Sequence, residues 1–401
     1  GKPDSIRDFI HEQFVYLADQ ANMPYSNYAE IHKKELLVEH ILKNAIFLIN
    51  KRFHPTPFSD KISHDKPEIK AMVIACNTAT AYGKDELEEF LKLQEINMKV
   101  IGVIDAGANG ALECLENSDS GIIAVFATPA TVKSKAYVSA INRIIAEKHY
   151  SGNIQIVQQG GKGLHESIDN KPEFIKHGTD LIYEAYQGPS LNDDFYKIEK
   201  KLLDVYRFDT TENHLLYNHR YLKQSDTIQI NSIENYVRYH VVSLIEKLSK
   251  SGTGPPLKSI ILGCTHYPYV KDEIEKVFNE LKSLPEYSSI IAEEIRLIDP
   301  AENTAAELYS YLAENDLLNI PDRDRIDESL FFISVPNTSN PAVEVTDEGG
   351  FTYQYQYYDR EINQLQDYTL IVPFSNKVIS ISQLQQIQRK FPTSYNIISE
   401  H

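Results

Sequence analysis

Short aliphatic runs alternate with helix-type patterns between residues 14 and 157. The runs that predict strands are residues 14–17, 71–75, 100–104, 121–126 and 154–157. Apolar residues at helical spacing predict helices over 30–51, 84–93, 106–115 and 132–148. Because aliphatic strands flanked by helices are typical of sheets covered on both faces, this region predicts an α/β fold with mostly parallel sheets.

Residues 170–250 interrupt this pattern, since they are polar and rich in tyrosine, with one helical stretch at 233–248. A Ser-Lys-Ser-Gly-Thr-Gly-Pro-Pro loop follows at 249–256. The α/β pattern then resumes, with strands predicted at 259–262 and 294–298 and helices at 271–281 and 303–312. The tail from about Glu328 predicts strands, and it includes a Tyr/Gln-rich stretch at 353–358 and an apolar one at 368–372.

Length and charge narrow the class of protein. A chain of 401 residues suggests about two or three domains. With 40 Lys+Arg against 57 Asp+Glu, the net charge of −17 repels phosphate backbones and anionic membranes, so we expect neither nucleic acid nor a membrane as partner. No apolar run approaches the ~20 residues of a membrane span.

Cysteine usage indicates the compartment. Three cysteines are a poor basis for a disulfide scaffold in a chain of this length, so we expect free thiols and a cytoplasmic protein. A leader ahead of Gly1 would instead make it an exported one.

Two segments share one arrangement: a buried-type strand, a cysteine, a small polar residue and a helix. Residues 73–79 read Val-Ile-Ala-Cys-Asn-Thr-Ala, and residues 260–268 read Ile-Ile-Leu-Gly-Cys-Thr-His-Tyr-Pro. In an open α/β sheet this places Cys76 and Cys264 at the carboxyl edge, where ligands bind. Free backbone N–H groups at a helix start stabilise a thiolate and bind anions.

Two thiols that face each other across a cleft suit one reaction in particular. One thiolate removes a proton from a carbon acid and the other thiol returns one on the opposite face, which inverts the stereocentre. A third junction, residues 124–134, places Thr128 and Thr131 where they can hold a carboxylate. The alternative for Thr131 is a simple helix N-cap.

Other interpretations of the cysteines remain open. A lone cysteine after an aliphatic run is typical of core packing, which is our interpretation of Cys114. A zinc site formed by Cys76, Cys264 and His266 is an alternative, but close Cys-x-x-Cys pairs are absent, so we predict no metal. A Cys/His hydrolase would leave the second cysteine motif unexplained.

At these residues the chain resembles the glutamate racemase family, within the aspartate/glutamate racemase superfamily. The cysteine motifs at 75–79 and 263–268 carry the resemblance. Supporting matches lie at 14–19 with 23–25, at 128–137 and at 297–302. The likeness spans roughly residues 14–170 and 255–315.

The resemblance implies a cofactor-independent racemase of two pseudosymmetric Rossmann-like (flavodoxin-like) domains with the active site in the interdomain cleft. Cys76 would be the base towards D-glutamate and Cys264 towards L-glutamate, with His266 assisting Cys264. The implied partner is a small acidic amino acid, and a homodimer is a further expectation. The product, D-glutamate, would supply peptidoglycan. The residues implied to bind substrate are Pro24, Tyr25, Ser26, Asn77, Thr78, Thr128, Thr131 and Thr265.

The chain departs from the family in several places. The family opens with a strand and an Asp-Ser-Gly-x-Gly-Gly loop, whereas this chain starts at Gly1 after that element, so we expect a preceding segment. Ser26 stands where the family usually has glycine, and the supporting carboxylate is either Glu166 or Asp169. Residues 178–250 are a large insertion, and the tail after about 316 is an extension.

We therefore predict a first domain at 1–125, with part of 295–315 packing back on it, a second at 126–295, and a β-rich extension at 316–401. Glutamate racemisation is the leading hypothesis. Racemisation of another acidic amino acid such as aspartate is the alternative enzyme, and a non-catalytic carboxylate-binding protein on the same scaffold is the non-enzyme alternative.

Overall fold

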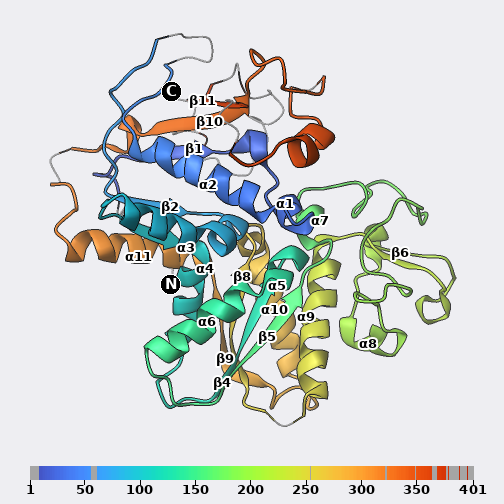
Figure 1. Ribbon diagram of the computed structural model, residues 1–401. Coiled ribbons are helices and arrows are strands. Elements are labelled where there is room, and N and C mark those ends of the chain that lie inside the picture. Colours follow the sequence, from blue (N-terminus) through green and yellow to red (C-terminus); the bar gives the residue numbers. More distant parts are fainter. Residues whose placement is uncertain are drawn as a thin grey trace. The chain divides into compact units, whose positions relative to one another are not determined.

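A computed structural model describes residues 9–55, 61–252, 254–320, 323–347, 349–363 and 368–375, with the single residues 378, 388 and 395 (Figure 1). The chain divides into two compact units: unit 1 comprises residues 1–101 and 305–401, and unit 2 comprises residues 102–304. This division differs from the predicted domain boundaries at 125 and 295. β4 (Gly121–Ala127), which spans the predicted boundary at 125, lies wholly in unit 2, because its hydrogen bonds run to strands of that unit.

Unit 2 is built on a four-stranded sheet in the order β5 (Ile154–Gly160), β4, β8 (Leu257–Gly263) and β9 (Ile291–Ile298). Each neighbouring pair is parallel, which confirms the predicted α/β class with parallel strands. All seven residues of β4 are buried. Such a strand needs cover on both of its faces, as the aliphatic pattern predicts.

Helices cover that sheet. Residues of α9 (Ile233–Lys250) and α10 (Lys271–Lys282) share one apolar core with Ile122, Ala124 and Phe126 of β4. In the same unit, α4 (Val103–Leu112) contacts both α6 (Ala136–Glu147) and β8. Among the described residues, no helix is both long and apolar enough to span a membrane.

Two element boundaries in this region differ from the prediction. The apolar run at 100–104 is divided between β3 (Lys99–Gly102) and α4, because Gly102 is extended and caps the helix that starts at Val103. The helix predicted at 132–148 is two helices, α5 (Pro129–Ser134) and α6, since Lys135 between them has a φ of 56°.

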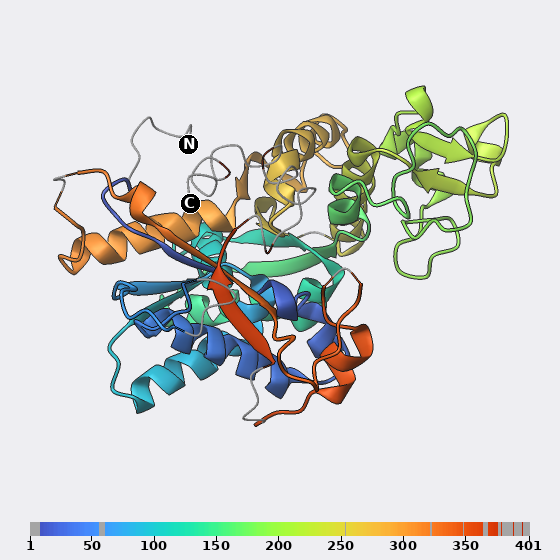
Figure 2. The same ribbon diagram turned by 90° about the horizontal axis from the view of Figure 1, so that it is seen from above.

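Residues 178–232 of the predicted insertion project beside the unit 2 sheet (yellow-green in Figure 2), and residues 233–250 are α9. The projecting part contains the antiparallel pair β6 (Leu215–Tyr217) and β7 (Ile228–Ile230), and the short helix α8 (Leu203–Tyr206). Its remaining turns are η2 (Lys200–Leu202), η3 (Thr211–Asn213) and η4 (Leu222–Gln224).

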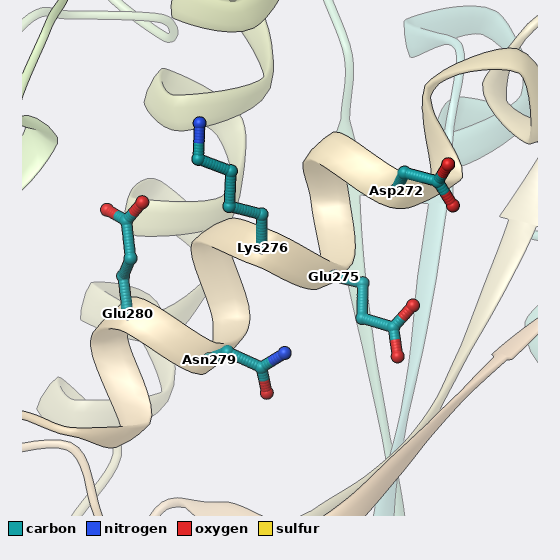
Figure 3. Close-up of a pocket in the computed structure, with 5 residues that line it drawn as sticks. All are labelled: Asp272, Glu275, Lys276, Asn279 and Glu280. Carbon is teal, nitrogen blue, oxygen red and sulfur yellow. The ribbon is translucent and has the colours of Figure 1, made fainter.

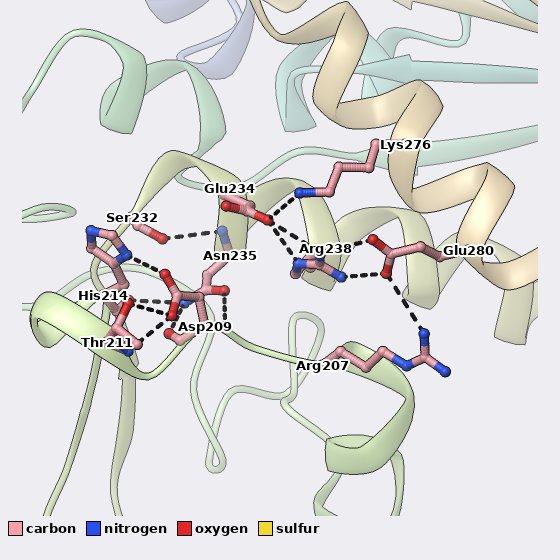
Figure 4. A network of polar contacts seen from close by, with 10 residues as sticks. All are labelled: Arg207, Asp209, Thr211, His214, Ser232, Glu234, Asn235, Arg238, Lys276 and Glu280. Carbon is pink, nitrogen blue, oxygen red and sulfur yellow. Dashed lines mark hydrogen bonds and ion pairs between the residues drawn. The ribbon is translucent and has the colours of Figure 1, made fainter.

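Buried Asn235 of α9 ties the insertion to the unit 2 core. Its Nδ2 donates to the backbone oxygens of Asp209 and His214, and its Oδ1 accepts from the Asp209 amide (Figure 4). On the same helix, Arg238 is ion-paired with Glu234 and with Glu280 of α10. The insertion is therefore held to the core through a helix that also packs on the sheet.

The strands of unit 1 fall into two sheets. β1 (Val15–Ala18) pairs in parallel with β10 (Leu330–Pro336), which pairs antiparallel with β11 (Thr369–Pro373). The second sheet is β2 (Ala71–Ile74) with β3. The helices that begin or end in this unit are α1 (Ser26–Glu30), α2 (Lys34–Ile49), α3 (Asn77–Leu93) and α11 (Pro300–Glu314).

The strand prediction for the tail is confirmed at β10 and β11 and wrong at 353–358. That stretch forms a helical turn, η7 (Tyr355–Asp359). Tyr355, Gln356 and Tyr357 are all buried. A strand points successive side chains to opposite faces, so it would bury three in a row only if both of its faces were covered.

Candidate active site

Cys76 lies at the start of α3, directly after β2. It occupies the N-cap position of the helix in extended conformation and is half-buried. Burial raises the pKa of its thiol, whereas hydrogen bonds from the backbone N–H groups of Ala79 and Thr78 and from the Thr78 side chain lower it. The unpaired N–H groups of a helix start therefore face this sulfur, as the sequence predicts.

The loop after β1 contributes the other predicted site residues of unit 1. The Asp19 carboxylate accepts hydrogen bonds from Tyr25 and from Asn44 Nδ2, the latter at 3.0 Å. Burial, Asp19 and Cys76 raise the pKa of Tyr25, so its hydroxyl stays protonated. Pro24 is exposed and Ser26 begins α1.

An apolar cluster brings this loop and the first cysteine together. Tyr25 and Ala79 belong to one buried cluster, and Cys76 packs against it. Asn77 and Thr78 lie partly buried in the first turn of α3. Tyr25, Asn77 and Thr78 thus lie close to Cys76, although the Tyr25 hydroxyl is already bonded to Asp19.

Cys264 follows β8 and is more deeply buried, with 7% of its surface exposed. Burial raises the pKa of its thiol to about 12, and the carboxylates of Glu166 and Asp169 add to the rise. The backbone N–H groups of His266 and Tyr267 act in the opposite direction. The Sγ atom lies 3.7 Å from His266 Nδ1, so the imidazole is within reach as a proton acceptor for this thiol.

The second nitrogen of His266 contacts a carboxylate. Its Nε2 lies 3.2 Å from Asp169 Oδ2, at the end of α7 (Leu164–Ile168). Glu166, the other candidate, has its Oε2 3.0 Å from His165 Nδ1. Both carboxylates therefore lie near Cys264. It is Asp169 that contacts His266, the histidine beside the thiol.

His165 is the residue in this group that the sequence-based reasoning missed. Its ring lies 5.7 Å from that of His266. Burial lowers the pKa of His165 to about 4, and His266 contributes to the shift. The one signal in the sequence was its position directly before Glu166.

The threonine loop of unit 2 corrects one expectation. Thr128, and not Thr131, is the N-cap of α5: its Oγ1 accepts from the Thr131 amide at 3.3 Å and lies 3.0 Å from Thr131 Oγ1. Thr131 is buried in the first turn. Thr265 is exposed, with its hydroxyl 3.4 Å from His266 Nδ1.

The known proteins that are similar to this chain include glutamate racemases. No family model matches the chain. The glutamate racemase of Clostridium novyi is 24% identical over 80% of this chain and 81% of its own length. The glutamate racemase of Aquifex pyrophilus is 32% identical over 52% of this chain and 73% of its own length. The chain belongs to the glutamate racemase family. Its class is therefore that of an amino-acid racemase.

Among solved structures, that of glutamate racemase isoform RacE1 from Bacillus anthracis covers 81% of this chain and 79% of its own. The sequence identity is 20% and the TM-score is 0.45.

A surface hollow of about 650 Å³ lies along α10, outside the groups described above. Figure 3 shows its lining side chains on successive turns of that helix: Asp272, Glu275, Lys276, Asn279 and Glu280. None of them is a predicted site residue. Three carboxylates against one ammonium group disfavour an acidic amino acid there, so this hollow does not fit the expected substrate class.

The zinc alternative is not tested by the structure. Within the described ranges, no three His, Cys, Asp or Glu side chains gather in a way that could hold a metal ion. The three residues of that alternative are divided between the units, with Cys76 in unit 1 and Cys264 and His266 in unit 2.

Proposed function

We propose that this racemase interconverts L-glutamate and D-glutamate without a cofactor, by a two-base 1,1-proton transfer between Cys76 and Cys264. The observation that carries the proposal is that each thiol follows a strand and lies beside groups that stabilise a thiolate. The names of the relatives support glutamate as the substrate. As part of the same proposal, the enzyme acts in the cytoplasm and supplies D-glutamate for peptidoglycan.

In the direction from L-glutamate, Cys264 acts as the base. Its proton passes to His266, which leaves a thiolate beside an imidazolium that Asp169 stabilises. The thiolate takes the α-proton, the electrons of the C–H bond move into the substrate carboxylate, and the Cys76 thiol donates its proton to the opposite face. Cys76 is then the thiolate, held by the N–H groups of Thr78 and Ala79, and it is the base for the reverse reaction.

The remaining predicted residues bind substrate in this proposal. Fixed hydrogen-bond donors must stabilise the extra charge on the carboxylate as the α-proton leaves, since that proton is a very weak acid. Asn77, Thr78 and Thr265 supply side-chain donors next to the two thiols, and Thr128 and Thr131 supply two hydroxyls 3.0 Å apart. Pro24, Tyr25 and Ser26 border the distal end.

The test is exchange of the α-proton with solvent deuterium, followed from each enantiomer of glutamate. We expect the parent to exchange both, and C76A and C264A each to lose racemisation. C114A is the matched control, because Cys114 lies in the turn after α4, where its Sγ donates to the Gly110 backbone oxygen at 3.4 Å, and it is no part of the proposed site. If both single variants racemise as fast as C114A does, the two-thiol mechanism is wrong.

Thiol modification gives an independent check. Alkylation should abolish activity in the C114A background, and saturating glutamate should protect against it. Activity that survives complete modification of both remaining cysteines would contradict the proposal.

Another acidic amino acid is the second candidate substrate. Ser26, in place of the glycine that the family resemblance leads us to expect, adds a hydroxyl at the distal end of the proposed site. Exchange measured in parallel with aspartate and glutamate, compared as kcat/KM, separates the two. Binding of glutamate without exchange of either amino acid would instead favour a carboxylate-binding protein.

A further inference from the structure

The tail of the chain folds back onto the loop that carries the predicted substrate residues of unit 1. We call residues 351–360 the strap and residues 22–28 the substrate loop. Gln356 Nε2 donates to the backbone oxygen of Met23 at 3.1 Å, and the Tyr357 hydroxyl donates to that of Pro24 at 3.3 Å. In Figure 1 the strap is the orange-red turn next to α1. These bonds fix the backbone directly before Tyr25.

Arg360, at the end of the strap, bonds the strap to the substrate loop. It is only 2% exposed. Its Nη1 donates to Asn22 Oδ1 at 2.8 Å and its Nη2 to the Tyr28 hydroxyl at 2.7 Å, so one guanidinium spans both ends of the substrate loop. The guanidinium also lies over the ring of Phe351, 4.6 Å from its centroid.

The setting of Arg360 is unusual for a buried charge. Among the described residues, its side-chain hydrogen-bond partners are all neutral: Asn22, Tyr28 and the Gln356 backbone oxygen. A buried cation without a carboxylate is costly unless hydrogen bonds and aromatic faces compensate it. The bonds to the substrate loop are part of that compensation, so loop and strap are energetically coupled.

The loop in turn contacts the group around Cys76. Asn22, which accepts from Arg360, donates its own Nδ2 to Asp19 Oδ1 at 2.8 Å, and Asp19 accepts from Tyr25. Tyr357 of the strap belongs to the same buried cluster as Tyr25, against which Cys76 packs. A continuous set of contacts thus runs from Arg360 to the first proposed catalytic thiol.

We infer that the strap is a positioning element for substrate binding, with Arg360 as its positioning residue. It holds the substrate loop so that Pro24, Tyr25 and Ser26 form the distal end of the site. This inference rests on the proposed function, because the loop matters for catalysis only if it binds substrate. Loss of the strap therefore weakens substrate binding more than it slows proton transfer.

The decisive variant is R360M, which keeps much of the side-chain volume and removes the donors. R360K retains a charge with fewer directed bonds, and Y357F removes only one hydroxyl. R238M in unit 2 is the matched control, because Arg238 is also buried and multiply bonded, but its partners are Glu234 and Glu280. Hydrogen–deuterium exchange of the backbone amides at 20–31 reports the loop without any need for activity.

We expect R360M to speed amide exchange at 20–31 by about tenfold and to raise KM by about tenfold, with kcat within about threefold of the parent. R360K should lie between R360M and the parent, and R238M should change neither quantity. Folded R360M with unchanged exchange and KM would overturn the inference, as would exchange that rises uniformly over the whole chain.

Two outcomes separate this inference from the proposed function. If R360M does not fold, Y357F decides: a KM raised about two- to threefold supports the strap, and an unchanged KM overturns it. If the parent racemises no amino acid while R360M still loosens residues 20–31 selectively, the proposed function fails and the coupling of strap and loop stands.

Discussion

Cys76 and Cys264 follow strands in the same way and both accept from backbone N–H groups, but their side-chain partners differ. Cys76 caps the 17-residue helix α3, and the donors that lower its pKa are backbone N–H groups and one threonine hydroxyl. Cys264 precedes only a short turn, η5 (Tyr267–Val270), and its nearest side-chain partner is His266. Backbone dipoles thus act on both thiols, and the second also lies beside a group that can accept a proton.

This difference indicates two ways to make a weak acid reactive in one fold. Fixed dipoles stabilise a thiolate without taking up its proton, so they suit a thiol that receives its charge during the reaction. An imidazole next to a carboxylate can remove the proton from a resting thiol. Removing the proton from the Cys264 thiol requires more free energy than for an ordinary thiol, since burial and two carboxylates raise its pKa to about 12.

The largest expected effect comes from His266. We expect H266N to lower kcat/KM about 10³-fold, because the thiol of Cys264 loses its proton acceptor. A racemisation has an equilibrium constant of one, so kcat/KM falls equally in both directions. The asymmetry appears in the primary deuterium isotope effect, which should increase from L-glutamate and not from D-glutamate. H177N, at an exposed histidine bonded to Asn170, is the control.

The ionisation of Cys264 gives the next effect. In a C76S/C114S variant, the rate of alkylation should rise about 30-fold between pH 8.5 and pH 10, because a thiol with a pKa near 12 is still ionising there. An ordinary thiol would gain only about twofold over that interval. Rates measured with iodoacetamide under native conditions distinguish the two, and a plateau near pH 9 would contradict the assigned setting of Cys264.

At the other thiol, the loss of Thr78 should lower kcat/KM less, and it should change the isotope effect for the other enantiomer. T78A removes one hydrogen bond to Cys76 and should lower kcat/KM about tenfold. Here the isotope effect should increase from D-glutamate. T78S keeps the hydroxyl and should stay close to the parent. Equal isotope effects from both enantiomers in T78A would contradict the assignment of Cys76 to D-glutamate and Cys264 to L-glutamate.

The smallest effect concerns stability in acid. The pKa of His165 falls from 6.5 to about 4 on folding, so the unfolded chain binds more protons between these values. The contribution of neutral His165 to the free energy of unfolding is then fully present above about pH 6.5, and it declines as the pH falls towards 4. H165N should flatten this decline by about 1 kcal/mol, measured by urea unfolding at several pH values.

The contribution of His165 must be separated from those of two other buried histidines. His240 in unit 2 and His40 in unit 1 also have lowered pKa values because they are buried. The difference between H165N and the parent isolates His165, since both chains keep the other two. An identical decline in both would show that His165 is not part of the acid response.

The local pattern of the sequence was enough to predict the strand–cysteine junctions, the parallel strands of unit 2 and the gathering of Asn77 and Thr78 next to Cys76. These features depend on neighbours in sequence: an aliphatic run forms the strand, and the residue that ends it takes the helix cap. The alternative interpretation of Thr131 as a helix cap was wrong for a local reason, because Thr128 precedes Pro129, which favours the first helical position.

Only the tertiary structure decided which carboxylate meets His266, where the units divide, and that residues 353–358 form a turn. Each depends on residues far apart in the chain. Gln356 and Met23, for example, are 333 positions apart and share a hydrogen bond. Periodicity reports which side chains are apolar, but it does not report what covers them, and a buried arginine such as Arg360 has no apolar pattern to reveal it.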